Sequence, residues 1–189
     1  MQARAKATAE TRERILEAAE ETFDSASIDE FTLAAIAERA GVSVQTVLRH
    51  FDSRDGMLAA TLMHVGAKMR SSREAAPVDD TAGAVAALVG YFDMYGDRIL
   101  RLIAERERNP TVRVMTDFGW THHREWCERA FATTLAGLSG VSRERRLAQL
   151  SMITGIHVWK ILRRHNELSQ RQTELAIREM LEPLIDSDA

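Results

Sequence analysis

The sequence predicts an all-α protein of about nine helices. Apolar residues recur at three- and four-residue spacing along most of the chain, and no segment shows the strict alternation typical of a strand. Only three of the 189 residues are prolines, which favours long helices over a strand-and-turn fold. With 45% hydrophobic and 28% charged residues, the composition is that of a globular protein.

The N-terminal segment divides into an arm and a helix. Residues 1–10 have no strong helical moment and carry cations, so a flexible arm is expected there, with a disordered tail as the favoured interpretation. A first helix is predicted from about Thr11 to Asp24, because Ile15, Ala19 and Phe23 share one face.

The stretch from Thr32 to Phe51 contains two short amphipathic patterns that meet at a glycine. Gly41 tolerates the positive φ that ends a helix, while Thr32 and Ser43 offer side-chain oxygens that can cap the two helices. The apolar positions are Leu33, Ile36, Ala37 and Ala40 in the first pattern and Val44, Val47 and Phe51 in the second. This layout predicts a helix-turn-helix.

A glycine-turned helical hairpin also occurs in proteins that never touch DNA. The outward side chains of the second helix favour DNA here, because Gln45, Thr46, Arg49 and His50 are all hydrogen-bonding types that packing does not need.

A long helix should follow, capped by Ser53. Its apolar stripe contains Met57, Leu58, Leu62, Val65 and Met69. The segment around Pro77 breaks the pattern, and a domain boundary is predicted near it, which makes residues 53–75 the link between two domains.

Beyond the boundary only helical patterns appear. One face is formed by Val85, Leu88, Val89 and Phe92, and a second, short helix is expected around Ile99, Leu102 and Ile103, before Asn109 and Pro110. A long helix is predicted from about Thr111 to Leu135. Another, capped by Ser142, should run to His165, and a last one should begin at the Ser169–Gln172 capping box and end or kink at Pro183.

Residues 11 to 60, read in order, resemble the tetracycline-repressor (TetR) family. The resemblance rests on Ile15, Ala18, Ala19 and Phe23, then on IAERAGVS, RHF, a cationic residue and Leu58. It implies a helix-turn-helix DNA-binding domain over residues 11–54 and an effector-binding and dimerisation domain over residues 76–189. It also implies a homodimeric transcription factor, most often a repressor, that a small molecule releases from a palindromic operator in double-stranded DNA.

Two positions depart from the family pattern. A glycine is usual near Ser27, and the segment from Ser25 to Ser27 supplies none. Leu48 stands where the family most often has a tyrosine whose hydroxyl donates to phosphate, and leucine cannot replace that hydrogen bond.

If the second helix enters the major groove, Gln45 is the best base reader, because a glutamine amide pairs bidentately with adenine. Val44 can rest on a thymine methyl or pack internally, and Arg49 can reach guanine or a phosphate. By resemblance, Thr32, Thr46 and His50 touch the DNA backbone, and Arg54 takes the place of a phosphate-binding lysine. The predicted DNA-binding residues are Thr32, Ser43, Val44, Gln45, Thr46, Leu48, Arg49, His50 and Arg54.

The charge balance predicts few phosphate contacts. The net charge is −3, and residues 1–75 contain ten Lys and Arg against twelve Asp and Glu. A modest salt dependence per subunit is expected, with useful affinity depending on dimerisation.

The helix after Pro110 is unusually rich in aromatic and imidazole groups. By resemblance this helix lines the effector cavity, and an apolar or aromatic effector is expected; packing in an interhelical core is the competing interpretation for several of the residues. The predicted effector-binding residues are Phe92, Tyr95, Met115, Phe118, Trp120, His122, His123 and Trp126. His123 and Cys127 have metal-ligand spacing, but two ligands fall short of the usual three or four, so no metal or other cofactor is predicted.

Dimerisation is expected through the last two helices, paired with their symmetry mates in a four-helix bundle. The predicted dimer residues are Met152, Gly155, Ile156 and Trp159, and the run HVWKILRRHNELS resembles the family's penultimate helix. An internal core helix is the competing interpretation.

Other protein classes fit less well. A helical enzyme could use His122, His123 or His157. However, the sequence contains no phosphate loop, no GxSxG motif and no spaced set of metal ligands that would support this class. A helical ligand-binding or interaction protein without specific DNA binding remains the alternative. The single cysteine excludes an internal disulfide, and neither a signal peptide nor an apolar run long enough for a membrane span is seen, so a cytoplasmic protein is expected.

Overall fold

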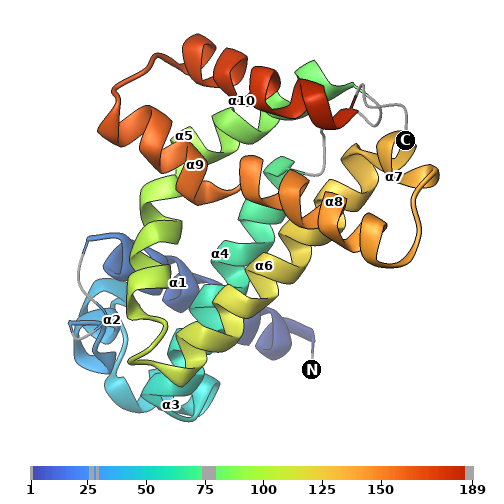
Figure 1. Ribbon diagram of the computed structural model, residues 1–189. Coiled ribbons are helices and arrows are strands. Elements are labelled where there is room, and N and C mark those ends of the chain that lie inside the picture. The colour runs from blue at the N-terminus through green and yellow to red at the C-terminus, as the bar shows by residue number, and fades with distance from the viewer. Residues whose placement is uncertain (1, 26–27, 29, 74–79, 186–189) are drawn as a thin grey trace. The chain divides into compact units, whose positions relative to one another are not determined.

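The computed structural model describes residues 2–25, 28, 30–73 and 80–185, and within them every regular element is a helix, as predicted. Figure 1 shows the chain from its blue N-terminus to its red C-terminus. The chain divides into two compact units. Unit 1 contains Met1–Lys68 and Glu105–Met115, and unit 2 contains Met69–Ala104 and Thr116–Ala189.

The first helix, α1, spans Gln2–Ser25, so the predicted start near Thr11 and the flexible arm before it were wrong for residues 2–10. These residues are mostly alanine, lysine, arginine and glutamate, which favour helix even without an amphipathic pattern. Lys6 lies 3.9 Å from Glu10 one turn later, and the Thr11 hydroxyl donates to the Ala7 carbonyl at 2.9 Å. Local propensity and side-chain pairs therefore extend the helix where periodicity gave no signal.

The two helices of the predicted helix-turn-helix are α2, Leu33–Ala40, and α3, Val44–Phe51. Both predicted caps are confirmed: Thr32 Oγ1 accepts from the Ala35 amide and Ser43 Oγ accepts from the Thr46 amide, each at 3.2 Å. Gly41 has φ of 63°, and the Val42 amide donates to the Ala37 carbonyl at 2.9 Å. The turn between the helices is thus a glycine-terminated C-cap, as the sequence predicted.

The fourth helix, α4, spans Arg54–Arg73, and Ser53 caps it by accepting from the Gly56 amide at 3.0 Å. All five residues of its predicted apolar stripe are buried. Those from Met57 to Val65 belong to unit 1, where the rings of Phe23 and Phe31 meet edge to face at 6.5 Å. The turn at Ala26 and Ser27 and the boundary at Pro77 lie outside the described residues.

Helix α5 spans Thr81–Glu105 without interruption, so the separate short helix predicted around Ile99 does not exist. Phe92, Gly96, Ile99 and Ile103 continue one face at helical spacing, and no proline intervenes. Helix α6, Pro110–Ala130, begins with Pro110 at its first position, where a missing amide costs nothing.

The long helix predicted to reach Leu135 ends at Ala130. Phe131 leaves helical geometry (φ −118°, ψ 32°), and its ring lies 2% exposed, edge-on to Trp126 at 6.1 Å. A short helix, α7, follows at Ala132–Ala136. The break therefore accompanies burial of a large aromatic ring in the core of unit 2.

The helix predicted from Ser142 to His165 is three segments. Helix α8, Gly140–Ile153, contains Ser142 rather than starting at it, and α9, Ile156–Lys160, continues into a π-helical turn, η1, Ile161–His165. The last helix is α10, Gln170–Ile185. Its capping box is confirmed, because Ser169 Oγ accepts from the Gln172 amide at 3.3 Å and Gln172 Oε1 accepts from the Ser169 amide at 3.1 Å.

The core of unit 2 gathers side chains from α5 to α10 around one fully buried indole, that of Trp159. Its Nε1 donates to Asp93 at 2.8 Å, and the ring lies against the backbone of Gly96. This hydrogen bond and this ring contact hold α5 against α9.

Candidate nucleic-acid interface

The N-terminal half of α3 presents polar atoms to solvent. Ser43, Val44 and Gln45 are exposed, and within the described part of the chain no hydrogen bond holds the Gln45 amide. The hydroxyls of Ser43 and Thr46 lie 2.9 Å apart. Gln45 is therefore available to an external partner and sits on a helix end whose geometry is fixed by capping.

The opposite face of α3 anchors it in unit 1. Val47 and Phe51 are buried, and Leu48 is half-buried, so Leu48 contributes packing where a tyrosine would have offered a hydroxyl. Arg49 is exposed, while the half-buried His50 ring lies 6.1 Å from that of Phe51. Thr32, which caps α2, is also exposed.

Arg54 is engaged inside the protein. Its Nε donates to the Phe31 carbonyl at 2.9 Å, another guanidinium nitrogen donates to the Ile28 carbonyl, and a third lies 3.8 Å from Asp55. The guanidinium therefore ties the segment before α2 to the start of α4, and a phosphate would have to compete with these contacts.

Two further arginines of α1 reach the helix-turn-helix, and sequence reasoning gave neither a specific role. Arg14 Nε donates to the Ala40 carbonyl at the end of α2, at 3.1 Å. The Arg12 guanidinium lies over the Phe51 ring, 5.1 Å from its centroid. Residue spacing could have indicated the position of Arg12. It shares one face of α1 with Leu16, Ala19 and Phe23, so its side chain is expected to lie near the core.

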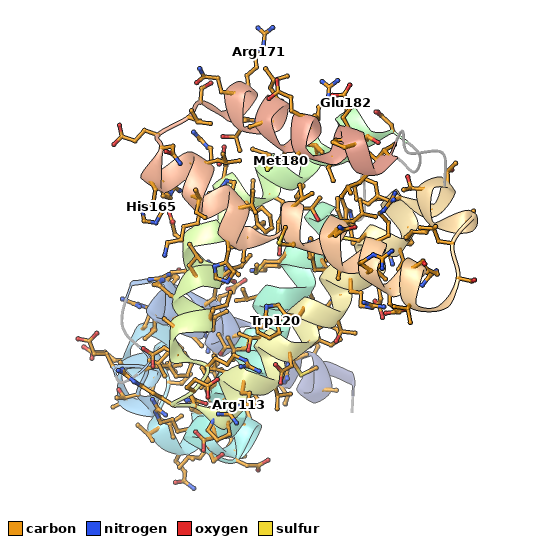
Figure 2. All side chains as sticks on the ribbon, in the orientation of Figure 1. Arg113, Trp120, His165, Arg171, Met180 and Glu182 are labelled. Atoms are coloured by element: carbon orange, nitrogen blue, oxygen red, sulfur yellow. The ribbon has the colours of Figure 1, made fainter. Side chains whose placement is uncertain are left out.

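The predicted effector residues differ in burial. Phe92 and Trp126 are buried in the core of unit 2, whereas Phe118 and Trp120 are each 50% exposed on α6, where Figure 2 labels Trp120. Met115, half-buried, belongs to unit 1. For Phe92 and Trp126, core packing is the interpretation that the structure supports.

The remaining aromatic residues pair locally. Phe118 stacks on the half-buried His122 with centroids 6.3 Å apart and lies 5.3 Å below the Arg70 guanidinium. Tyr95, half-buried on α5, contacts Tyr91 at 5.4 Å between ring centroids. His122 Nδ1 lies 3.7 Å from the Glu125 carboxylate.

His123 connects α6 to the break between α8 and α9. Its Nε2 lies 3.1 Å from the Ser151 carbonyl and 3.2 Å from Thr154 Oγ1, and its ring stacks on Trp126 at 5.9 Å. The buried Cys127 Sγ is 3.8 Å from the same nitrogen. Within the ranges that the structure describes, no group of three or more His, Cys, Asp or Glu side chains could hold a metal ion.

The predicted dimer residues separate into two groups. Trp159 is 0% exposed and Ile156 8% exposed, so both belong to the core of unit 2, and for them the structure supports the competing interpretation of an internal core helix. Apolar spacing alone cannot tell a helix's inner face from an interface. Met152 is 66% exposed, and Gly155 lies at the half-exposed break before α9.

The family model of bacterial regulatory proteins, tetR family, matches residues 15–61. The HTH-type transcriptional regulator BetI of Paraburkholderia phytofirmans is 27% identical over 138 residues, which cover 71% of this chain and 62% of the relative. BetI of Burkholderia thailandensis is 37% identical over 54 residues, 29% of this chain and 28% of the relative. The chain thus spans less than two thirds of the length of these relatives.

Solved structures share the fold. GusR of Salmonella enterica has a TM-score of 0.70 at 19% identity, over 94% of this chain and 96% of that one. A transcriptional regulator from Rhodococcus sp. Rha1 has a TM-score of 0.68 at 17% identity, over 92% and 95%. Of the helices described, none is long and apolar enough to cross a membrane. The matched segment and the BetI relatives make the chain similar to bacterial regulatory proteins of the tetR family, and the solved structures share its fold.

Proposed function

We propose that the protein is a sequence-specific transcriptional regulator that binds double-stranded DNA through α3. The observation that carries this proposal is the capped N-terminal end of α3, where Gln45 is exposed while Val47 and Phe51 hold the helix in unit 1. A rigid helix with unpaired polar atoms at its N-terminal end is what major-groove reading requires.

The first experiment is selection of bound fragments from a random DNA pool, followed by sequencing. Enrichment of a palindrome supports a dimeric, sequence-specific regulator. Failure to enrich any sequence would favour the alternative of a helical ligand-binding or interaction protein.

Gln45→Ala is expected to relax the preference at one base pair in each half-site, because a bidentate amide–adenine contact is worth about 1–3 kcal/mol of discrimination. The measurement is the affinity for the selected operator and for its single-base variants. Gln149→Ala, an exposed glutamine of α8, is the control and should leave the preference unchanged. Equal losses on operator and random DNA for Gln45→Ala would exclude base reading by this side chain.

We propose that the working form is a homodimer, which places two copies of α3 about 34–36 Å apart on adjacent major grooves. Met152 on α8 and Leu175 and Met180 on α10 support an apolar dimer surface, because all three are exposed on helices that pack together in unit 2. Met180 can be found on α10 in Figure 2. Sedimentation equilibrium tests this, and a monomer at micromolar concentration would contradict it.

We propose that the protein represses transcription and that an apolar or aromatic effector releases it from the operator. Exposed Phe118 and Trp120 on α6 support such a ligand class. Typical coupling of about 1–3 kcal/mol would change operator affinity about 5- to 150-fold. A ligand that binds tightly without changing operator affinity would exclude this switch. No catalytic activity, metal or cofactor is part of the proposal, and a cytoplasmic location fits it.

A further inference from the structure

We propose that Arg12 of α1, held by stacking on Phe51, binds a DNA phosphate at the C-terminal end of α3 and forms the phosphate clamp together with Arg49. The inference rests on the DNA binding proposed above and deepens it, because it assigns the backbone contact to a different helix from the one that the sequence suggested.

The cations of unit 1 are mostly engaged by the protein itself, since neighbouring groups neutralise or hydrogen-bond them. The pairs are Lys6 with Glu10, Arg14 with the Ala40 carbonyl, Arg39 with Thr22 and Glu21, Arg54 with two carbonyls and Asp55, Lys68 with Glu20, Arg106 and Arg113 with Glu107, and Arg108 with Glu105.

Arg12 and Arg49 differ from these cations. Within the described residues, neither guanidinium has a hydrogen bond or an ion pair, and both side chains are exposed. A cation that the protein leaves unpaired keeps its full charge for an external anion, and DNA affinity depends on the phosphates that such cations neutralise.

The contact with Phe51 fixes where the Arg12 charge lies. Its Cζ is 5.1 Å from the ring centroid, and Phe51 is itself 5% exposed and packed in the core of unit 1. A guanidinium placed over an aromatic ring still has N–H groups that can donate to another partner. Such N–H groups match the bidentate geometry of a phosphate.

Arg49 precedes Phe51 by two residues on α3, so both unpaired cations lie at the same end of the reading helix. The helix dipole also favours positive charge there. Arg54, in contrast, has its nitrogens bound to the segment before α2. Among the described side chains of unit 1, the two guanidinium groups with neither a hydrogen bond nor an ion pair therefore lie beside α3.

The test compares Arg12→Gln with Arg113→Gln in the full-length protein. Arg113 is the matched control, because it is an exposed arginine of the same unit whose guanidinium already lies 3.1 Å from Glu107. Binding to the selected operator and to random DNA is measured over a range of salt concentrations.

For Arg12→Gln we expect affinity to fall about tenfold on both DNAs at low salt, since a charge-assisted contact is lost in each subunit. The slope of log affinity against log salt should decrease by about one per subunit, or about two for a dimer. Arg113→Gln should leave both quantities unchanged.

Phe51→Leu tests the stacking, with folding checked by circular dichroism and thermal unfolding. If the ring positions Arg12, Arg12→Gln should weaken binding less in the Phe51→Leu background than in the wild-type protein, and equal losses in the two backgrounds would exclude the stack. If Phe51→Leu does not fold, Arg12→Lys takes its place: lysine keeps the charge without the planar fork, and wild-type affinity in this variant would exclude the stacked geometry.

The outcomes separate the two proposals. Wild-type protein that binds no DNA overturns the proposed function. Wild-type protein that binds its operator while Arg12→Gln behaves like Arg113→Gln overturns the Arg12 assignment alone.

Discussion

Asp93→Ala is expected to lower the free energy of unfolding by about 2–3 kcal/mol, because it removes the acceptor of three N–H donors inside unit 2. Asp93 accepts from Trp159 Nε1 at 2.8 Å and from Arg163 Nε and a terminal nitrogen at 2.9 and 3.0 Å. The Asp93 and Arg163 side chains are 21% and 22% exposed, so the charge of Arg163 would stay largely out of water. Urea denaturation followed by tryptophan fluorescence measures the loss.

Asp97→Ala is the matched control, one turn further along α5. Asp97 accepts from Arg164 Nε and a terminal nitrogen at 3.2 and 2.9 Å, but the two side chains are 69% and 39% exposed. An exposed pair contributes about 0–1 kcal/mol. An equal decrease in the free energy of unfolding for the two variants would show that burial of the Asp93–Arg163 pair does not add to its stabilising effect.

The Asp97 pair also predicts the pH at which its contribution disappears. Hydrogen bonding from Arg164 lowers the pKa of Asp97 below its usual range, with the Arg164 and Arg101 charges adding to this and desolvation opposing it. A carboxyl with a lowered pKa stabilises the fold above its unfolded pKa, about 3.9, and loses that stabilisation as the pH falls through the folded value. The difference between Asp97→Ala and wild type should therefore be present at neutral pH and vanish in strong acid.

Gly96→Ala is expected to destabilise the protein by about 1–3 kcal/mol, although alanine is the better helix former. A Cβ at Gly96 would lie 2.5 Å from Cη2 and Cζ3 of Trp159, closer than carbon atoms can approach. The indole cannot shift easily, since its Nε1 is bonded to Asp93 and its ring packs on Phe92 at 5.9 Å. Overpacking should exceed the gain of about 0.5–1 kcal/mol in helix propensity.

Gly90→Ala, on the same helix, should have the opposite effect and stabilise the protein. Within the described residues a Cβ there meets nothing within 4 Å, so only the propensity gain of about 0.5–1 kcal/mol remains. Thermal unfolding of the two variants side by side provides the measurement. A rise in melting temperature for both variants would mean that the contact between Gly96 of α5 and Trp159 of α9 has room for a methyl group.

What the sequence predicted well was local. Thr32, Ser43, Ser53 and the Ser169–Gln172 pair cap helices through neighbours three residues away, so residue type and spacing carry enough information. Gly41 likewise needs only its own backbone to end α2.

The errors come from residues whose place depends on distant partners. Trp159 and Ile156 have the spacing of an interface, but both are buried in the core of unit 2, and Phe131 ends α6 where periodicity predicted a continuous helix. The phosphate contact of Arg54 stays a prediction, but its carbonyl partners lie 23 and 26 residues away and could not be inferred from its position in the pattern. Single-sequence periodicity contains no information on such contacts.

Because of the π-helical turn at Ile161–His165, the contacts of this segment depend on the number of residues in it. Because η1 closes with the Asn166 amide bonded to the Ile161 carbonyl five residues back, at 2.9 Å, consecutive arginines can both reach α5, Arg163 at Asp93 and Arg164 at Asp97. Deleting one residue from this turn would rotate the residues after the deletion by about 100°, the step of one residue in a 3.6-residue turn. Relatives that keep both arginine–aspartate pairs should therefore also keep the number of residues between Trp159 and Ser169, even where the side chains differ.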